Sequence, residues 1–135
     1  MMAASLSLTA CGGASAAESV DLREVPLDTI LEKAKEEGQI NSVGMPDDWA
    51  NWRGSWAAVS EKYGLTHEDT DMSSAEELST FETEKDAATK DIGDVGQAFG
   101  PPAVEMDVVQ PYQARTWHSI PDWAKDPAGQ WCLSY

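Results

Sequence analysis

The 135-residue sequence has little positive charge, few cysteines and no long hydrophobic run. It carries 24 acidic residues against 9 basic ones, which gives a formal net charge of −15. Nucleic acid is therefore not an expected partner, because phosphate binding requires clustered lysine and arginine. No apolar run approaches the roughly 20 residues of a membrane-spanning helix. The six tryptophans argue against disorder, since disordered chains are poor in aromatic residues.

The sequence also lacks the common motifs of catalytic and cofactor sites. It contains no G-x-S-x-G segment, no phosphate-binding P-loop and no G-x-G-x-x-G segment. The two histidines, His67 and His118, are not spaced like metal ligands. Because no nucleophile–base pair and no set of metal ligands can be recognised, we expect neither an enzyme nor a cofactor.

The two cysteines lie near opposite ends of the chain, at Cys11 and Cys132. The segment "LTAC" at 8–11 resembles a bacterial lipobox, in which the signal peptide is cut before a cysteine that is then lipidated. A buried, apolar Cys11 is the alternative, but only small residues follow it. We therefore predict a signal peptide over 1–10, a lipidated Cys11 with a flexible tether over 11–25, and a chain anchored outside the cytoplasm. Cys132 is predicted to be an interior thiol of a last strand.

Apolar periodicity predicts two helices in the first half of the chain. The first begins near Pro26 and ends at Gly38, with Leu27 and Ile30 on its apolar face. The second is indicated by apolar residues at spacings of three and four, and Asp48 is its expected N-cap. Its apolar stripe is formed by Trp49, Trp52, Trp56, Val59 and Tyr63.

The second half of the chain is predicted to continue the alternation of helices and strands. Ser74 and Glu77 have the spacing of a capping box and predict a helix over 73–88. Strands are predicted at 40–44, 65–71, 92–95 and 130–135, a short helix at 101–106, and a loop at 111–129. The expected fold class is α/β, with βαβ units and a parallel sheet flanked by helices.

In such sheets, ligands bind outside the carboxyl ends of the strands. The loops expected at that edge are rich in carboxylates and aromatic rings, which would suit a primary amine or a hard metal ion. Each residue also has a structural interpretation, for example capping a helix, and helix N-termini favour anions. The candidate ligand-binding residues are Asp47, Asp48, Trp49, Ser73, Ser74, Asp94 and Phe99, with Asp71 at the same edge.

Several segments together resemble the first part of an extracellular solute-binding protein, the ligand-capturing subunit of an ABC importer. They occur in order over 27–135 as "ILEKAKEEGQI", "GMPDDWANW", "EKYGLTHEDTDMSSAEEL", "DIGDVGQAFGP" and "IPDWAKDPAGQW". The resemblance is to the cluster that includes polyamine, iron and thiamine binders. A lipobox fits this family, because Gram-positive members are commonly tethered lipoproteins.

The resemblance implies a two-lobed periplasmic-binding-protein-like fold that closes on a small solute and docks on a transporter permease. In the first lobe, the solute contacts would come from the loops at Pro46–Trp49, Ser73–Ser74 and Gly96–Phe99. Family members are far longer, so we expect 26–135 to be an incomplete first lobe, an N-terminal fragment. The expected function is capture of a small, cationic solute. The alternative is a lipoprotein fragment without solute binding, or an interaction surface.

Overall fold

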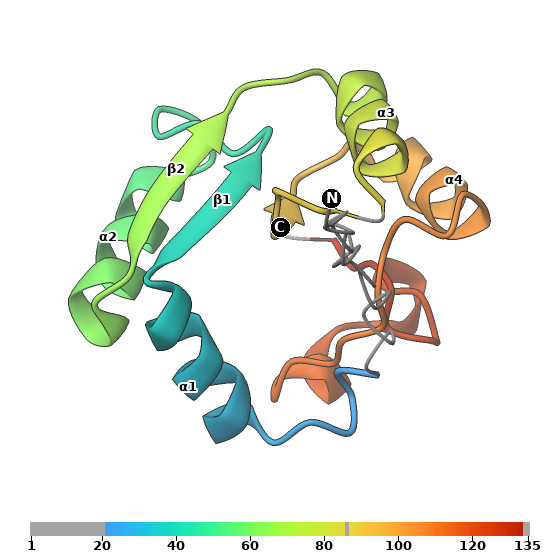
Figure 1. Ribbon diagram of the computed structural model, residues 1–135. Coiled ribbons are helices and arrows are strands. Elements are labelled where there is room, and N and C mark those ends of the chain that lie inside the picture. Colours follow the sequence, from blue (N-terminus) through green and yellow to red (C-terminus); the bar gives the residue numbers. More distant parts are fainter. Residues whose placement is uncertain (1–20, 86, 134–135) are drawn as a thin grey trace, which may run out of the picture.

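The computed structural model describes residues 21–133 except residue 86. The predicted signal peptide, Cys11 and most of the tether lie outside the described residues. The chain forms a three-stranded parallel sheet in the order β2-β1-β3, flanked by helices (Figure 1). The predicted α/β class with a parallel sheet is therefore confirmed. None of the described helices is long and apolar enough to cross a membrane.

Helix α1 (Leu27–Glu37) and strand β1 (Gln39–Val43) follow the predicted pattern closely. Pro26 precedes the helix, and Gly38 ends it with a left-handed backbone (φ 76°) that favours glycine. The amide of Gly38 donates to the carbonyl of Ala34. Helix α1 therefore ends at Gly38, and strand β1 begins at the next residue.

Helix α2 (Trp52–Tyr63) begins later than predicted. Ala50 and Asn51 have positive φ angles of 46° and 59°, so the backbone before Trp52 is not helical. Asn51 is the N-cap, and the prediction of Asp48 in that position was wrong. Trp49 consequently lies outside the helical stripe and is 48% exposed. Asparagine tolerates the left-handed conformation better than most residues, which explains the break at this point.

Strand β2 (Thr66–Thr70) pairs with β1 along its whole length. Helix α3 (Ser74–Thr83) begins one residue later than predicted and ends five residues earlier. Strand β3 is only Ile92–Gly93, although a strand over 92–95 was predicted. It pairs with the end of β1, so β1 is the central strand.

After β3, the chain forms mostly short helical turns. The turn η1 (Gln97–Phe99) leads into α4 (Gly100–Glu105), close to the predicted helix. The segment predicted as a loop contains η2 (Trp117–Ser119) and η3 (Asp122–Ala124). This last part, orange to red in Figure 1, lies across the molecule from β1 and β2.

The predicted last strand over 130–135 was wrong for the residues that the structure describes. Only one isolated antiparallel bridge, between Lys125 and Cys132, occurs there, and Cys132 is exposed. The segment is held by a turn in which the Asp126 carboxylate accepts hydrogen bonds from the amides of Ala128 and Gln130. A local turn therefore organises a segment for which sheet pairing was expected.

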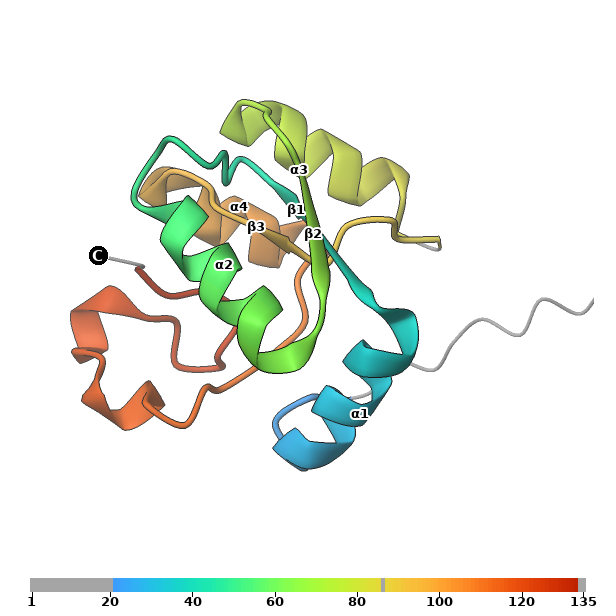
Figure 2. The same ribbon diagram turned by 90° about the vertical axis from the view of Figure 1, so that its left-hand side faces the viewer.

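The apolar core is small and divided between the sheet and the last segment. Figure 2 shows α1 below the strands and α2 beside them. All residues of α1 and α2 are described, and none of them is fully buried. The buried apolar residues are Val43, Met45, Leu65, Leu78, Ala103, Trp117 and Ala124.

Candidate functional site

The carboxyl ends of the three strands meet the start of α3 at one place. The amide of Gly44 donates to the carbonyl of Thr70 (3.2 Å), and the amide of Asp94 donates to the carbonyl of Val43 (3.2 Å). The amide of Gly96 donates to Ser74 Oγ at 2.9 Å. We call this region the strand-end junction and define it by Gly44, Thr70, Ser74, Glu77, Asp94 and Gly96. The predicted meeting of the loops after β2 and β3 is thus present.

Glu77 lies at the centre of the strand-end junction. It comes from the first turns of α3, is only 1% exposed, and packs against Gly44 and Gly93. A Cβ atom at Gly93 would lie 2.7 Å from Glu77 Oε2 and 2.9 Å from Phe81 Cζ, so a larger residue there would displace a neighbouring side chain. Burial, followed by the charges of Asp94, Asp69 and Asp71, raises the pKa of Glu77 to about 7.

Asp94 supplies a second carboxyl to the junction, from the loop after β3. Burial raises the pKa of Asp94 above its usual value. The indole N–H of Trp52 opposes this shift, although its nitrogen makes no well-formed hydrogen bond. Glu77 Oε2 and Asp94 Oδ2 are both buried, and neither atom has a hydrogen-bond partner among the residues that the structure describes. Buried polar atoms without partners are unusual and point to a role beyond packing.

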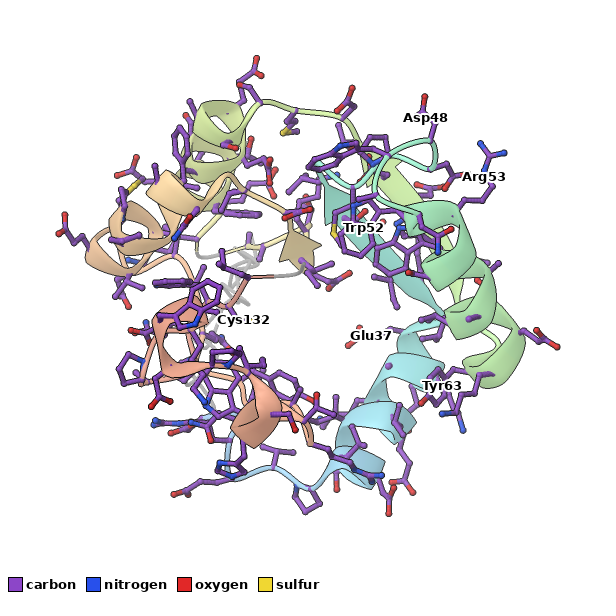
Figure 3. The ribbon with its side chains drawn as sticks, turned by 180° about the vertical axis from the view of Figure 1, so that it is seen from behind. Glu37, Asp48, Trp52, Arg53, Tyr63 and Cys132 are labelled. Carbon is purple, nitrogen blue, oxygen red and sulfur yellow. The ribbon has the colours of Figure 1, made fainter. Side chains whose placement is uncertain are left out.

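The loop after β1 presents its polar side chains to solvent. Asp47 and Asp48 are exposed, and Asp47 pairs with Arg53 across the surface at 3.6 Å. In Figure 3, the side chains of Asp48 and Arg53 point away from the molecule, whereas Trp52 points inward. The structure therefore does not bring this predicted group into the strand-end junction. Asp47, Asp48 and Trp49 form a separate outer rim.

The two predicted serines have different structural roles. Ser73 is the N-cap of α3, and the Glu76 carboxylate accepts hydrogen bonds from its amide and its hydroxyl. The capping box is therefore Ser73 with Glu76, and its prediction at Ser74 and Glu77 was wrong by one residue. This shift frees Ser74 to bind Gly96 and places Glu77 on the buried face. Phe99 is half-buried in η1, near Gly96.

Two depressions lie near these loops. The larger, about 320 Å³, is open and shallow, and Asp71 contributes to its wall. The smaller, about 30 Å³, has room for little more than a water molecule and lies between the loop after β3 and the last segment. The larger depression is lined by Asp71, Met72, Glu76, Ser79 and Thr80, and the smaller by Val95, Gly96, Gln97, Gly100, Trp131, Cys132 and Leu133. Glu77 lines neither of them.

A second polar cluster, which sequence reasoning missed, lies between β1 and β2. Ser42 Oγ lies 2.8 Å from His67 Nε2 and donates to Asp69 Oδ1. Asp69 Oδ1 also accepts the amide of Met45 at 3.1 Å. The ring of Trp56 stacks on His67 at 3.8 Å. We call Ser42, His67 and Asp69 the strand-pair network.

The strand-pair network has the residue types of a catalytic triad but not its geometry. The carboxylate of Asp69 bonds the serine instead of orienting the imidazole, and Ser42 is 0% exposed. A substrate could not reach this hydroxyl without unfolding the strand pair. The network is consistent with a structural role, in which His67 and Asp69 satisfy the buried hydroxyl of Ser42.

No group of three or more His, Cys, Asp or Glu side chains that could hold a metal ion occurs in the described part of the chain. The candidate chemistry of the junction is therefore that of two carboxyls, Glu77 and Asp94. Sequence reasoning missed Glu77 as a site residue, although one signal could have found it. Glu77 lies three residues after Ser74 and four before Phe81, which places it on the inward face of the helix.

Comparisons with known proteins find a likeness in structure but none in sequence. No protein-family model matches the sequence, and no curated protein matches it significantly. Among solved structures, the chain resembles a Trichodesmium protein (IdiA, FutA) in complex with iron and citrate, with a TM-score of 0.60 and 18% sequence identity. The match covers 70% of this chain and 30% of that chain. The likeness shows the fold, a fragment of a periplasmic-binding-protein-like fold.

Proposed function

We propose that this chain is the solute-capturing part of an extracytoplasmic receptor for an ABC importer, and that it binds a small cation. One observation carries the proposal. The loops after β2 and β3 join at the strand-end junction, where Glu77 and Asp94 present buried carboxyl oxygens without a hydrogen-bond partner among the described residues. Carboxyls in this position suit ammonium groups and other cationic donors.

The position of the junction also supports the proposal. Open parallel sheets bind ligands outside the carboxyl ends of their strands, and the junction lies there. The outer rim of Asp47, Asp48 and Trp49 would add negative charge and an aromatic face at the approach to the site. The Trichodesmium protein of similar fold holds iron and citrate, so a small solute is in keeping with the architecture.

Anchoring and transport complete the proposed role. Lipidated Cys11 would hold the chain at the outer face of the membrane, where the receptor would deliver its solute to a permease. The chain spans about 30% of the length of the Trichodesmium protein, so a second lobe would supply the other wall of the site. Labelling of cells with a radioactive fatty acid tests the anchor. We expect label on the protein and none on the Cys11→Ala variant, and equal labelling of both would contradict it.

Calorimetric titration of the 135-residue chain tests solute capture. The probes are spermidine and thiamine, which are cations, and ferric citrate as a source of ferric ion, one for each solute class of the resembled cluster. We expect one of them to bind, and we expect Asp94→Asn to weaken binding about tenfold, because a charge-assisted hydrogen bond is lost. Asp28→Asn is the matched control, since it makes the same change on an exposed residue of α1, at the far end of β1 (Figure 1).

The alternative function is a lipoprotein fragment that binds no solute or that serves as an interaction surface. The half-exposed apolar faces of α1 and α2 favour it, because such faces normally pack against further structure. The same titration separates the two functions. If none of the three probes binds, or if Asp94→Asn and Asp28→Asn bind equally well, solute capture at the junction is wrong.

A further inference from the structure

The side chain of Glu77 connects three parts of the fold. It leaves α3 and ends against Gly44, directly after β1, and against Gly93 of β3. Neighbouring hydrogen bonds tie the same parts together, from Asp94 to Val43 and from Gly96 to Ser74. The state of one carboxyl group therefore affects how α3, β1 and β3 fit together.

This carboxyl group lies in surroundings that do not accommodate a negative charge. Within the described residues, Oε2 has no hydrogen-bond donor, and the buried Oδ2 of Asp94 has none either. The charged groups that act on Glu77 most strongly are Asp94 after β3, Asp69 on β2 and Asp71 after β2. All three are acidic, so each opposes ionisation of Glu77.

In the closed strand-end junction, the cation that fits beside the carboxyl of Glu77 is a proton. A metal ion would need further ligands, and the described residues contain no group of three or more suitable side chains. An organic cation would need space, but Glu77 lines neither depression. A protonated carboxyl needs neither, because it is neutral and brings its own hydrogen-bond donor.

We propose that Glu77 is a proton-operated switch of the strand-end junction. With its proton, the neutral side chain holds α3 against the ends of β1 and β3. Without it, Glu77 and Asp94 repel each other, the junction opens, and both carboxylates become available to a cation. The switch itself is independent of solute, and only this last consequence rests on the proposed function.

The direction of the pH dependence follows from the raised pKa of Glu77, about 7 instead of 4.5. Between these two values, the folded chain holds a proton that the unfolded chain releases. The folded state is therefore favoured at low pH, and this contribution to stability is lost as the pH rises through about 7. An ordinary paired carboxylate would show the opposite trend.

Thermal unfolding of the full chain provides the first test. We compare wild type with Glu77→Gln, which keeps the shape without the charge, at about pH 5.5 and about pH 8.5. Relative to this variant, the wild-type midpoint is expected to fall by about 5 °C between the two pH values. Glu82→Gln, an exposed residue of the same helix, is the matched control and should keep the wild-type pH dependence. If wild type and Glu77→Gln respond equally to pH, the proposal is overturned.

Nuclear magnetic resonance of the wild-type chain keeps the proposal testable if Glu77→Gln does not fold. With carboxyl-labelled glutamate, we expect the signal of Glu77 to titrate near pH 7, compared with about 4.3 for glutamate in model peptides. Hydrogen exchange should show opening of the amides of Gly44, Asp94 and Gly96 over the same pH range. If every glutamate titrates below about pH 6, or if these amides stay protected, there is no switch.

The affinity for spermidine separates this inference from the proposed function. If both are correct, spermidine binds more tightly above pH 7 than below it, and Glu77→Gln removes most of that difference. If the titration and the opening occur but no solute binds at any pH, the switch stands and the proposed function is wrong. If a solute binds with the same affinity above and below pH 7 and the amides stay protected, the proposed function stands and the switch is wrong.

Discussion

The sheet carries two polar clusters that differ in how their buried atoms are satisfied. In the strand-pair network, Ser42 bonds both His67 and Asp69, and Asp69 also accepts the amide of Met45. In the strand-end junction, Glu77 Oε2 and Asp94 Oδ2 find no partner among the described residues. Satisfied clusters stabilise a fold, whereas unsatisfied buried carboxyls cost stability and are typical of functional sites. Mutations in the two clusters should therefore lower the free energy of unfolding by different amounts.

The largest expected loss of stability follows from removing the carboxylate of the strand-pair network. Asp69→Ala removes the acceptor for the Ser42 hydroxyl and the Met45 amide, both of which are buried residues. The free energy of unfolding should fall by about 3 kcal/mol, as measured by urea denaturation. Asp71→Ala, an exposed neighbour beyond the end of the same strand, is the control and should change it little. If Asp69→Ala is as stable as wild type, the contrast between the two clusters is wrong.

An intermediate effect is expected at the neutral hydrogen bond of the strand-end junction. Ser74→Ala removes the acceptor for the Gly96 amide, and the free energy of unfolding should fall by about 1 kcal/mol. Exchange of the Gly96 amide hydrogen should accelerate in this variant. Ser79→Ala, on the exposed side of the same helix, provides the comparison and should leave that amide unchanged. Equal exchange in both variants would mean that Ser74 does not hold the loop.

The smallest change in stability is expected for a substitution on the outer rim. Asp47→Asn breaks an exposed pair with Arg53 at 3.6 Å, which water and salt already screen. The free energy of unfolding, measured in urea, should change by less than about 0.5 kcal/mol, because exposed ion pairs contribute little to stability. A loss above about 1 kcal/mol would show that the rim is part of the folded core and not a free surface for a ligand.

Local sequence signals predicted the elements whose boundaries depend on neighbouring residues. Gly38 and Gly64 end their helices because a left-handed backbone suits glycine, and the stop at Gly38 was predicted. Alternation of helices with strands likewise predicted a parallel sheet, since parallel strands need a crossover between them. The start of α2 was predicted wrongly, because the stripe that includes Trp49 continues through a non-helical turn at Ala50 and Asn51.

The meeting of the loops after β2 and β3 was predicted from the sequence, but the place of Glu77 between them was not. The edge at the carboxyl ends of the strands, Ser74 and Asp94 were named from the sequence, and both residues lie in the strand-end junction. Glu77 was assigned to a capping box, because Ser74 and Glu77 have the right spacing for one. The competing pair Ser73 and Glu76 forms the box instead. A shift of one residue on a helix rotates a side chain by about 100°, which turns a surface group into a buried one.

The sequence by itself determined the α/β class, the parallel strands, the helix stops and the acidic character of the loops, because these depend on residues close together in the chain. Only the tertiary structure decided which polar groups are satisfied. Asp69 meets Ser42 through the register of β1 with β2, and Glu77 meets Gly44 and Gly93 through the packing of α3. Burial and hydrogen-bond partners are set by groups dozens of residues apart, and these same factors determine which carboxyls ionise.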